Sequence, residues 1–191
     1  MATDFPASPS NGDTHAGFTY NSTTGTWDTV PSGIGSLTEV DQWRLSADIT
    51  SDVDPVSSDL ERVDDPVFSK LGTGMSVSSG VWTFPSTGIY EITVFLQAYI
   101  SVQDAAIALN THATINGGTD WDKLAQAAAG RNSATGNVFD DGSSQSIFNV
   151  TNTANVKLKF IASSIASPNY IRGDTDWNRT SFTFKRLGDS Q

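Results

Sequence analysis

Few side chains in this sequence are of the types that carry out covalent catalysis. The chain has two histidines, His15 and His112, and no cysteine. No Gly-x-Ser-x-Gly motif presents a serine nucleophile, and the turn Gly72-Thr73-Gly74 is not followed by the Gly-Lys-Ser/Thr that a phosphate-binding loop requires. We therefore interpret His112 as a half-exposed strand residue and expect that the protein is not an enzyme.

Acidic residues are plentiful, and two kinds of chemistry use them in groups. Glycoside hydrolysis needs two carboxylates, but the pairs Asp64-Asp65 and Asp140-Asp141 lie in turn-like sequence, where aspartate accepts local hydrogen bonds. Calcium binds several carboxylate and carbonyl oxygens, and Asp174 and Asp176 are the candidate ligands near the end of the chain. We expect no cofactor, with calcium as the one ion that these acids would suit.

Exposed aromatic rings offer a third chemistry, because the faces of tryptophan and tyrosine stack on sugar rings. Trp121, Tyr170 and Trp177 lie in loop-like or strand-edge sequence, so they are the candidate glycan contacts. The alternative is that these three rings cover the end of a hydrophobic core.

The charge balance narrows the range of partners. The 191 residues include 11 basic and 21 acidic side chains, for a net charge of −10, and 37% of the chain is hydrophobic. Such a protein repels phosphate backbones and anionic lipid surfaces, so we expect neither nucleic acid nor a membrane as a partner. No apolar run of about 18 residues is present, and residues 1–6 lack the features of a secretory signal.

Strict alternation of apolar and polar residues predicts a long strand over residues 88–100, in the middle of a sandwich sheet. The opposite face of this strand is polar except for two large rings, Phe95 and Tyr99, which is an unusual surface for a monomer. The apolar face consists of Tyr90, Ile92, Val94, Leu96, Ala98 and Ile100.

Similar alternation, separated by turn residues, continues along the rest of the chain. Residues 121–129 fit either a helix, because of their alanines, or a strand of small residues. Turn signals that recur roughly every 10–15 residues are typical of an all-β sandwich, and this is the fold class that we predict. Further strands are predicted over residues 40–45, 106–115, 146–150, 155–161 and 180–187, with a long acidic loop over residues 48–65.

The first 38 residues differ from the rest in their turn-rich sequence, in which residues 17–27 predict one small hairpin. Phe5, Phe18, Tyr20 and Trp27 are too many aromatic residues for a solvated linker, because such side chains dominate interface energetics. We therefore expect residues 1–38 to be an attachment arm and residues 39–191 a head domain. A flexible linker is the alternative for the first segment.

Within the head, residues 81–94 resemble a strand–turn–strand signature of a known family. Phe84, Pro85, Gly88 and Tyr90 are similar to the pattern in the trimeric jelly rolls shared by tumour necrosis factor and the globular head of the first complement component. The resemblance covers roughly residues 40 to 187 and implies a jelly-roll β-sandwich that forms homotrimers.

In such trimers one sheet face is buried around the three-fold axis. The resemblance therefore implies that Phe95 and Tyr99, on the outward face of the long strand, lie at the trimer interface. Each ring buries ~150–250 Å² when fully covered. The alternative is that the two rings pack under a loop of their own subunit.

Both ends of the chain resemble structural proteins of tailed phages, notably marine cyanobacterial ones. The similarity lies in residues 5–15, in Tyr20 and residues 25–27, and in residues 180–189. It implies a protein of the virion, a homotrimeric capsid decoration or short head fibre, whose aromatic arm residues attach it to capsid or tail proteins. The alternatives are a tail-fibre tip that recognises host surface glycans, a free carbohydrate-binding module and a glycan hydrolase.

Overall fold

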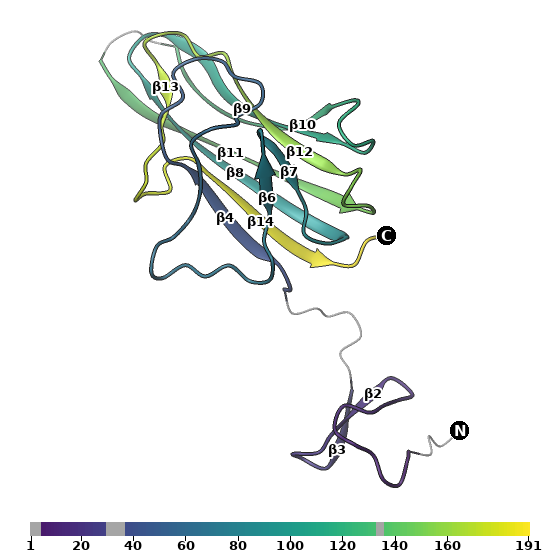
Figure 1. Cartoon of the computed structure of the whole chain (residues 1–191). Coiled ribbons are helices and arrows are strands. Elements are labelled where there is room, and N and C mark those ends of the chain that lie inside the picture. Colours follow the sequence, from purple (N-terminus) through teal and green to yellow (C-terminus); the bar gives the residue numbers. More distant parts are fainter. Residues whose placement is uncertain (1–4, 30–36, 133–135) are drawn as a thin grey trace. The chain divides into compact units, whose positions relative to one another are not determined.

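The computed structural model describes residues 5–29, 37–132 and 136–191 (Figure 1). The chain separates into two compact units, Met1–Ser36 and Leu37–Gln191, where we expected a division between residues 38 and 39. None of the described residues is helical, which confirms the all-β fold class. Accordingly, no helix in these ranges is long and apolar enough to cross a membrane.

Two antiparallel sheets form the head, and neither follows the order of the sequence (Figure 1). The first has the order β10-β9-β12-β7-β6 and consists of β6 (Ser76–Ser78), β7 (Val81–Thr83), β9 (Asp104–Thr114), β10 (Asp122–Arg131) and β12 (Lys157–Ser163). The second has the order β11-β8-β14-β4-β5 and consists of β4 (Val40–Leu45), β5 (Leu60–Arg62), β8 (Gly88–Ile100), β11 (Val138–Val150) and β14 (Ser181–Gly188). A short strand, β13 (Tyr170–Ile171), also pairs with β8.

Strand β8 supplies the centre of the core, and its bounds are those that the alternation predicted. Burial alternates residue by residue along its 13 positions, with the predicted apolar face inward. Trp82 of β7 is fully buried, and its ring lies 5.1 Å from those of Trp43 and Phe184 between centroids. Because these rings come from both sheets, they fix which face of each strand is buried.

Strand β10 covers most of residues 121–129, the segment whose sequence fitted either a helix or a strand. It passes so close to β11 that a Cβ on Gly142 would clash with the backbone of Ala128. Ala127 and Ala129 are buried at the same crossing. The small residues thus serve the close approach of two strands rather than helix formation.

Strand β11 begins eight residues before the predicted strand over residues 146–150. Asp140, which we expected in a turn, lies within it and accepts a hydrogen bond from the backbone N of Gly130 (2.8 Å to Oδ2). The prediction was wrong because Asp140, Gly142 and Ser144 occupy inward positions, opposite core residues of β8. Small and polar residues at inward positions conceal the alternation.

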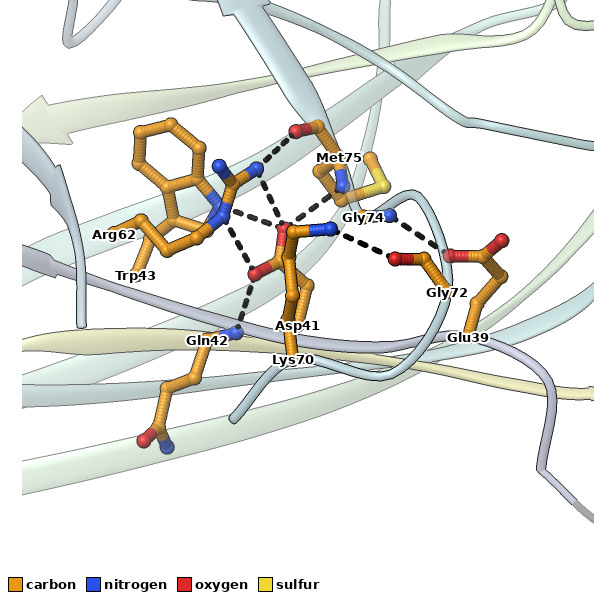
Figure 2. Close-up of polar contacts among 9 residues, drawn as sticks. All are labelled: Glu39, Asp41, Gln42, Trp43, Arg62, Lys70, Gly72, Gly74 and Met75. Atoms are coloured by element: carbon orange, nitrogen blue, oxygen red, sulfur yellow. Dashed lines mark hydrogen bonds and ion pairs between the residues drawn. The ribbon is translucent and has the colours of Figure 1, made fainter. Parts of the chain in front are cut away.

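A buried carboxylate connects the two sheets at the first strand of the head (Figure 2). Asp41 of β4 is 1% exposed and accepts hydrogen bonds from Arg62 Nε (2.9 Å) and Nη2 (3.1 Å). It also accepts bonds from Trp43 Nε1 (2.9 Å) and the backbone N of Met75 (2.8 Å). Because Met75 directly precedes β6 of the first sheet, this network joins β4 to the opposite sheet.

The turn Gly72–Gly74 is held by a second carboxylate beside the first (Figure 2). Glu39 accepts hydrogen bonds from the backbone N of Thr73 (3.2 Å) and of Gly74 (2.8 Å). Gly74 has a φ of +77°, and a Cβ there would lie 2.7 Å from Asp41 Oδ2, so the position requires glycine. The backbone amides that could have bound a phosphate are occupied by the protein's own carboxylates.

The N-terminal unit contains a three-stranded antiparallel sheet in the order β1-β2-β3. Strands β2 (Phe18–Asn21) and β3 (Thr26–Thr29) correspond to the predicted hairpin, whereas β1 (Thr14–His15) was not predicted. Residues 1–4 and 30–36 of the expected arm lie outside the described residues.

We expect Asp41→Asn to lower the free energy of unfolding of the head by about 3 kcal/mol, because Arg62 loses its buried partner. Urea titration followed by tryptophan fluorescence measures this loss. Asp54→Asn is the matched control, since the Asp54–Lys159 ion pair (2.7 Å) leaves Asp54 55% exposed and its loss costs below about 1 kcal/mol. Equal destabilisation of the two variants would contradict the connecting role of Asp41.

Candidate functional site

Phe95 and Tyr99 lie where the sequence placed them, on the face of β8 that points away from the core. Both are partly exposed. The register pairs Phe95 with Ser143 of β11 and Ser181 of β14, and Tyr99 with Phe139 of β11. We call the outward face of β8, β11 and β14 the outer face; it is the surface on which the remaining site residues are placed.

Three aromatic rings meet at one end of the outer face. Tyr170 of β13 stacks on Tyr99 with 4.8 Å between ring centroids, and Phe139 lies 5.7 Å from Tyr99. The guanidinium of Arg172 covers Phe139 at 4.1 Å and donates to Gln97 Oε1 (2.6 Å). Tyr99 is therefore covered in part by its own chain, as the alternative expectation had it, whereas Phe139 remains 58% exposed.

Phe95 forms part of an open hollow beside this cluster. The loop before β14 contributes Trp177, Asn178 and Arg179 to its lining, and β8 contributes Gln97. Trp177 is 64% exposed, and the Arg179 guanidinium lies 4.5 Å from its ring. The structure thus places one candidate glycan contact, Trp177, next to one candidate interface residue, Phe95.

Trp121 lies apart from this surface, at the turn before β10 of the other sheet. Its indole Nε1 donates to Gly118 O (3.1 Å), and Lys159 Nζ of β12 lies 5.1 Å from the ring centroid. The three candidate glycan contacts therefore do not form one site: Tyr170 and Trp177 neighbour the outer face, and Trp121 does not.

The two candidate calcium ligands, Asp174 and Asp176, contact different parts of the chain. Asp174 accepts hydrogen bonds from Arg179 Nε (2.8 Å) and from the backbone N of Asp176 (2.9 Å) and Trp177 (3.2 Å). The hydrogen bond from Arg179 is the main cause that lowers the pKa of Asp174, followed by the bond from the Asp176 amide. Asp176 instead lines another hollow, next to Arg44 and Asp64. Within the described parts of the chain, no three acidic or histidine side chains gather as a metal site.

His112 is a strand residue in β9, as expected. Lys123 and Lys159 lie opposite it on the two neighbouring strands. Burial lowers the pKa of His112, and the nearby charge of Lys159 lowers it further. The two neighbouring lysines disfavour the imidazolium that a histidine becomes when it activates a serine, and in such a triad a carboxylate stabilises that imidazolium.

The charges of the outer face cancel, unlike those of the whole chain. Glu91 of β8 forms an ion pair with Lys185 of β14 (3.0 Å). Asp141 of β11 accepts a hydrogen bond from Gln97 (3.0 Å), whose side-chain oxygen is bound by Arg172. With Arg172, which follows β13 and lies over Phe139, these two acids and two bases sum to zero, whereas the chain carries a net charge of −10.

Sequence reasoning missed two residues of the outer face, Phe139 and Ile147. Both project from β11 and are more than half exposed, at 58% and 59%. Residues 139 and 147 are separated by an even number of positions, which in one strand places both side chains on the same face. The sequence did not reveal this because the first part of β11 was not recognised as a strand. With them, the outer face presents apolar side chains on both β8 and β11.

The head is similar to solved structures of known proteins. Eiger TNF from S. frugiperda matches with a TM-score of 0.55 and 14% identity, over 80% of this chain and 94% of that chain. Murine APRIL at pH 8.5 matches with a TM-score of 0.52 and 15% identity, over 78% of this chain and 98% of that chain. No family model and no curated protein sequence matches the chain. The structural likeness confirms the tumour-necrosis-factor-like jelly-roll fold.

Proposed function

We propose that the protein is a non-enzymatic structural protein of a phage virion, a homotrimeric surface appendage whose N-terminal arm attaches it to capsid or tail proteins. A capsid decoration or a short head fibre is the form that fits best. The observation that carries the trimer is the outer face, where four apolar side chains are partly or largely exposed among polar residues and the charges cancel, on a strongly acidic chain.

The distribution of charge favours a second copy of the chain as the partner that covers the outer face. Two molecules that each carry a net charge of −10 repel one another, so a face whose own charges are already cancelled is one that opposes contact between copies least. Glu91 with Lys185 and Asp141 with Arg172 meet that condition on the outer face. The resemblance to trimeric jelly rolls supports the same face and a stoichiometry of three.

Apolar burial supplies the driving force for the proposed interface. Phe95, Tyr99, Phe139 and Ile147 remain partly or largely exposed in the single chain. Covering about 100 Å² of each side chain contributes about 2.5 kcal/mol at ~25 cal/mol per Å². Several such contributions per subunit are needed, because association itself costs about 4–15 kcal/mol.

The virion role is supported by the two ends of the chain. Residues 5–15, Tyr20, residues 25–27 and residues 180–189 resemble tailed-phage structural proteins, and the described part of the first segment folds into a sheet within a unit separate from the head. A small module joined to a head is the architecture that attachment to a particle requires.

We expect the protein at micromolar concentration to have three times the chain mass of 20.3 kDa in multi-angle light scattering. The double variant Phe95→Asp/Tyr99→Asp should run as a monomer, because six new carboxylates per trimer would have to be buried without partners. Ile115→Asp, at a position 80% exposed in the β9–β10 turn, is the control and should keep the trimeric mass. A wild-type monomer, or a trimeric double variant, would refute the proposed interface.

Deleting residues 1–36 tests the arm separately from the trimer. We expect the truncated protein to keep its trimeric mass but to be absent from assembled phage particles, as detected by antibody labelling in electron microscopy. The full chain should label the particle surface. Equal labelling by both forms would contradict the attachment role, and label confined to the tail would contradict the head location.

Glycan recognition at a tail-fibre tip is the second candidate, favoured by the hollow that contains Trp177. The exposed indole beside Asn178 and Gln97 offers a ring face and amide groups to a sugar. In this case Trp177→Ala should reduce adsorption of particles to host cells at least tenfold, with Trp121→Phe as the control. Unchanged adsorption of the Trp177→Ala particles would exclude this candidate.

A further inference from the structure

Five rings of the N-terminal unit contact one another on one face of its sheet. Phe5 lies over this face, with its ring centroid 5.0 Å from Trp27, 5.4 Å from Phe18 and 5.6 Å from His15. Tyr20 lies 5.4 Å from Trp27. We call these five residues the arm cluster. Its rings are only partly covered, and none of residues 5–28 is buried.

The other face of the same sheet is polar and internally hydrogen-bonded. Asp28 accepts hydrogen bonds from Asn21 Nδ2 (3.3 Å) and Thr26 Oγ1 (2.8 Å). Thr24 and Thr26 share a further hydroxyl contact (2.7 Å). The N-terminal sheet is therefore amphipathic, with one aromatic face that is incompletely covered and one face suited to water.

The N-terminal unit is small, so the incomplete burial of its aromatic rings matters for its stability. Below about 40 residues, folded units usually need disulfides, a metal or oligomerisation, because they bury too little surface. The chain has no cysteine, and its described residues contain no candidate metal group. Of the three means of stabilisation, association remains.

We propose that the N-terminal units of one oligomer pack their arm clusters against one another and form a second interface between copies of this chain. This inference rests on the proposed function, because an oligomeric head brings the units together at an effective concentration in the range of about 1 mM. Of the two acids among residues 5–29, Asp28 lies on the polar face, and the carboxylate of Asp13 accepts a hydrogen bond from the backbone N of Ser10 (2.7 Å). The aromatic residues, which the sequence led us to expect at the contact with the particle, then hold the arms together instead, and the polar face is left to meet the particle.

Spin labels test this arrangement in the full chain, since a protein without cysteine accepts single labelling sites. Thr23→Cys places a label in the exposed β2–β3 turn, and Ala154→Cys places one in the exposed turn between β11 and β12 of the head. Pulsed electron–electron double resonance then measures the distances between the spin labels on different copies of the chain. We expect a narrow distance distribution at both positions.

Variants of the N-terminal sheet identify the cause of a narrow distribution. Trp27→Ala should broaden the distances from residue 23 at least twofold while those from residue 154 stay narrow. Thr19→Ala, on the polar face opposite Asp28, is the matched control and should leave both distributions unchanged.

Three results would overturn the inference. A broad distribution at residue 23 with a narrow one at residue 154 would show independent arms on an intact oligomer. A distribution at residue 23 that stays narrow in Trp27→Ala would show that the arm cluster does not join the arms. The absence of any distance between copies at either position would instead refute the oligomer on which the proposed function depends.

Discussion

Strand β8 carries large side chains on both of its faces, and the chain itself buries one face completely and the other only in part. The inward face is buried against the first sheet, which holds the two sheets together as a sandwich. The outward face keeps Phe95 and Tyr99 partly exposed, and β11 adds Phe139 and Ile147 beside them. Exposed apolar side chains that gather on one face are typical of an interaction site.

Polar residues in the head act mainly within the chain. Asp41 and Glu39 occupy the amides of the turn before β6, and Asp174 is bound by Arg179 and two backbone amides. In such an acidic sequence, these carboxylates are the natural candidates for calcium binding or acid–base catalysis, and the turn amides are the candidates for phosphate binding. The hydrogen bonds of these carboxylates within the chain engage the oxygens that such chemistry would use.

The sequence predicted best where one face of a strand is uniformly apolar. Residues 88–100 were recognised over their full length, and the sandwich followed from the turn spacing. Strand β11 was mostly missed because Asp140, Gly142 and Ser144 stand at inward positions beside the close crossing of β10. The proximity of Trp177 to Phe95 and of Tyr170 to Tyr99 depends on how a loop folds back over the sheet, which no local pattern encodes.

Hydroxyl-radical footprinting of the intact protein tests most directly whether neighbouring copies cover the outer face. Phe139 is 58% exposed and Ile115 80% exposed in the single chain, so both side chains should be oxidised if the protein is alone in solution. We expect Phe139 to be oxidised at least fivefold more slowly than a phenylalanine with its exposure in the single chain would be. Ile115 should be oxidised at the rate of an exposed isoleucine. Unprotected oxidation of Phe139 would contradict the proposed interface.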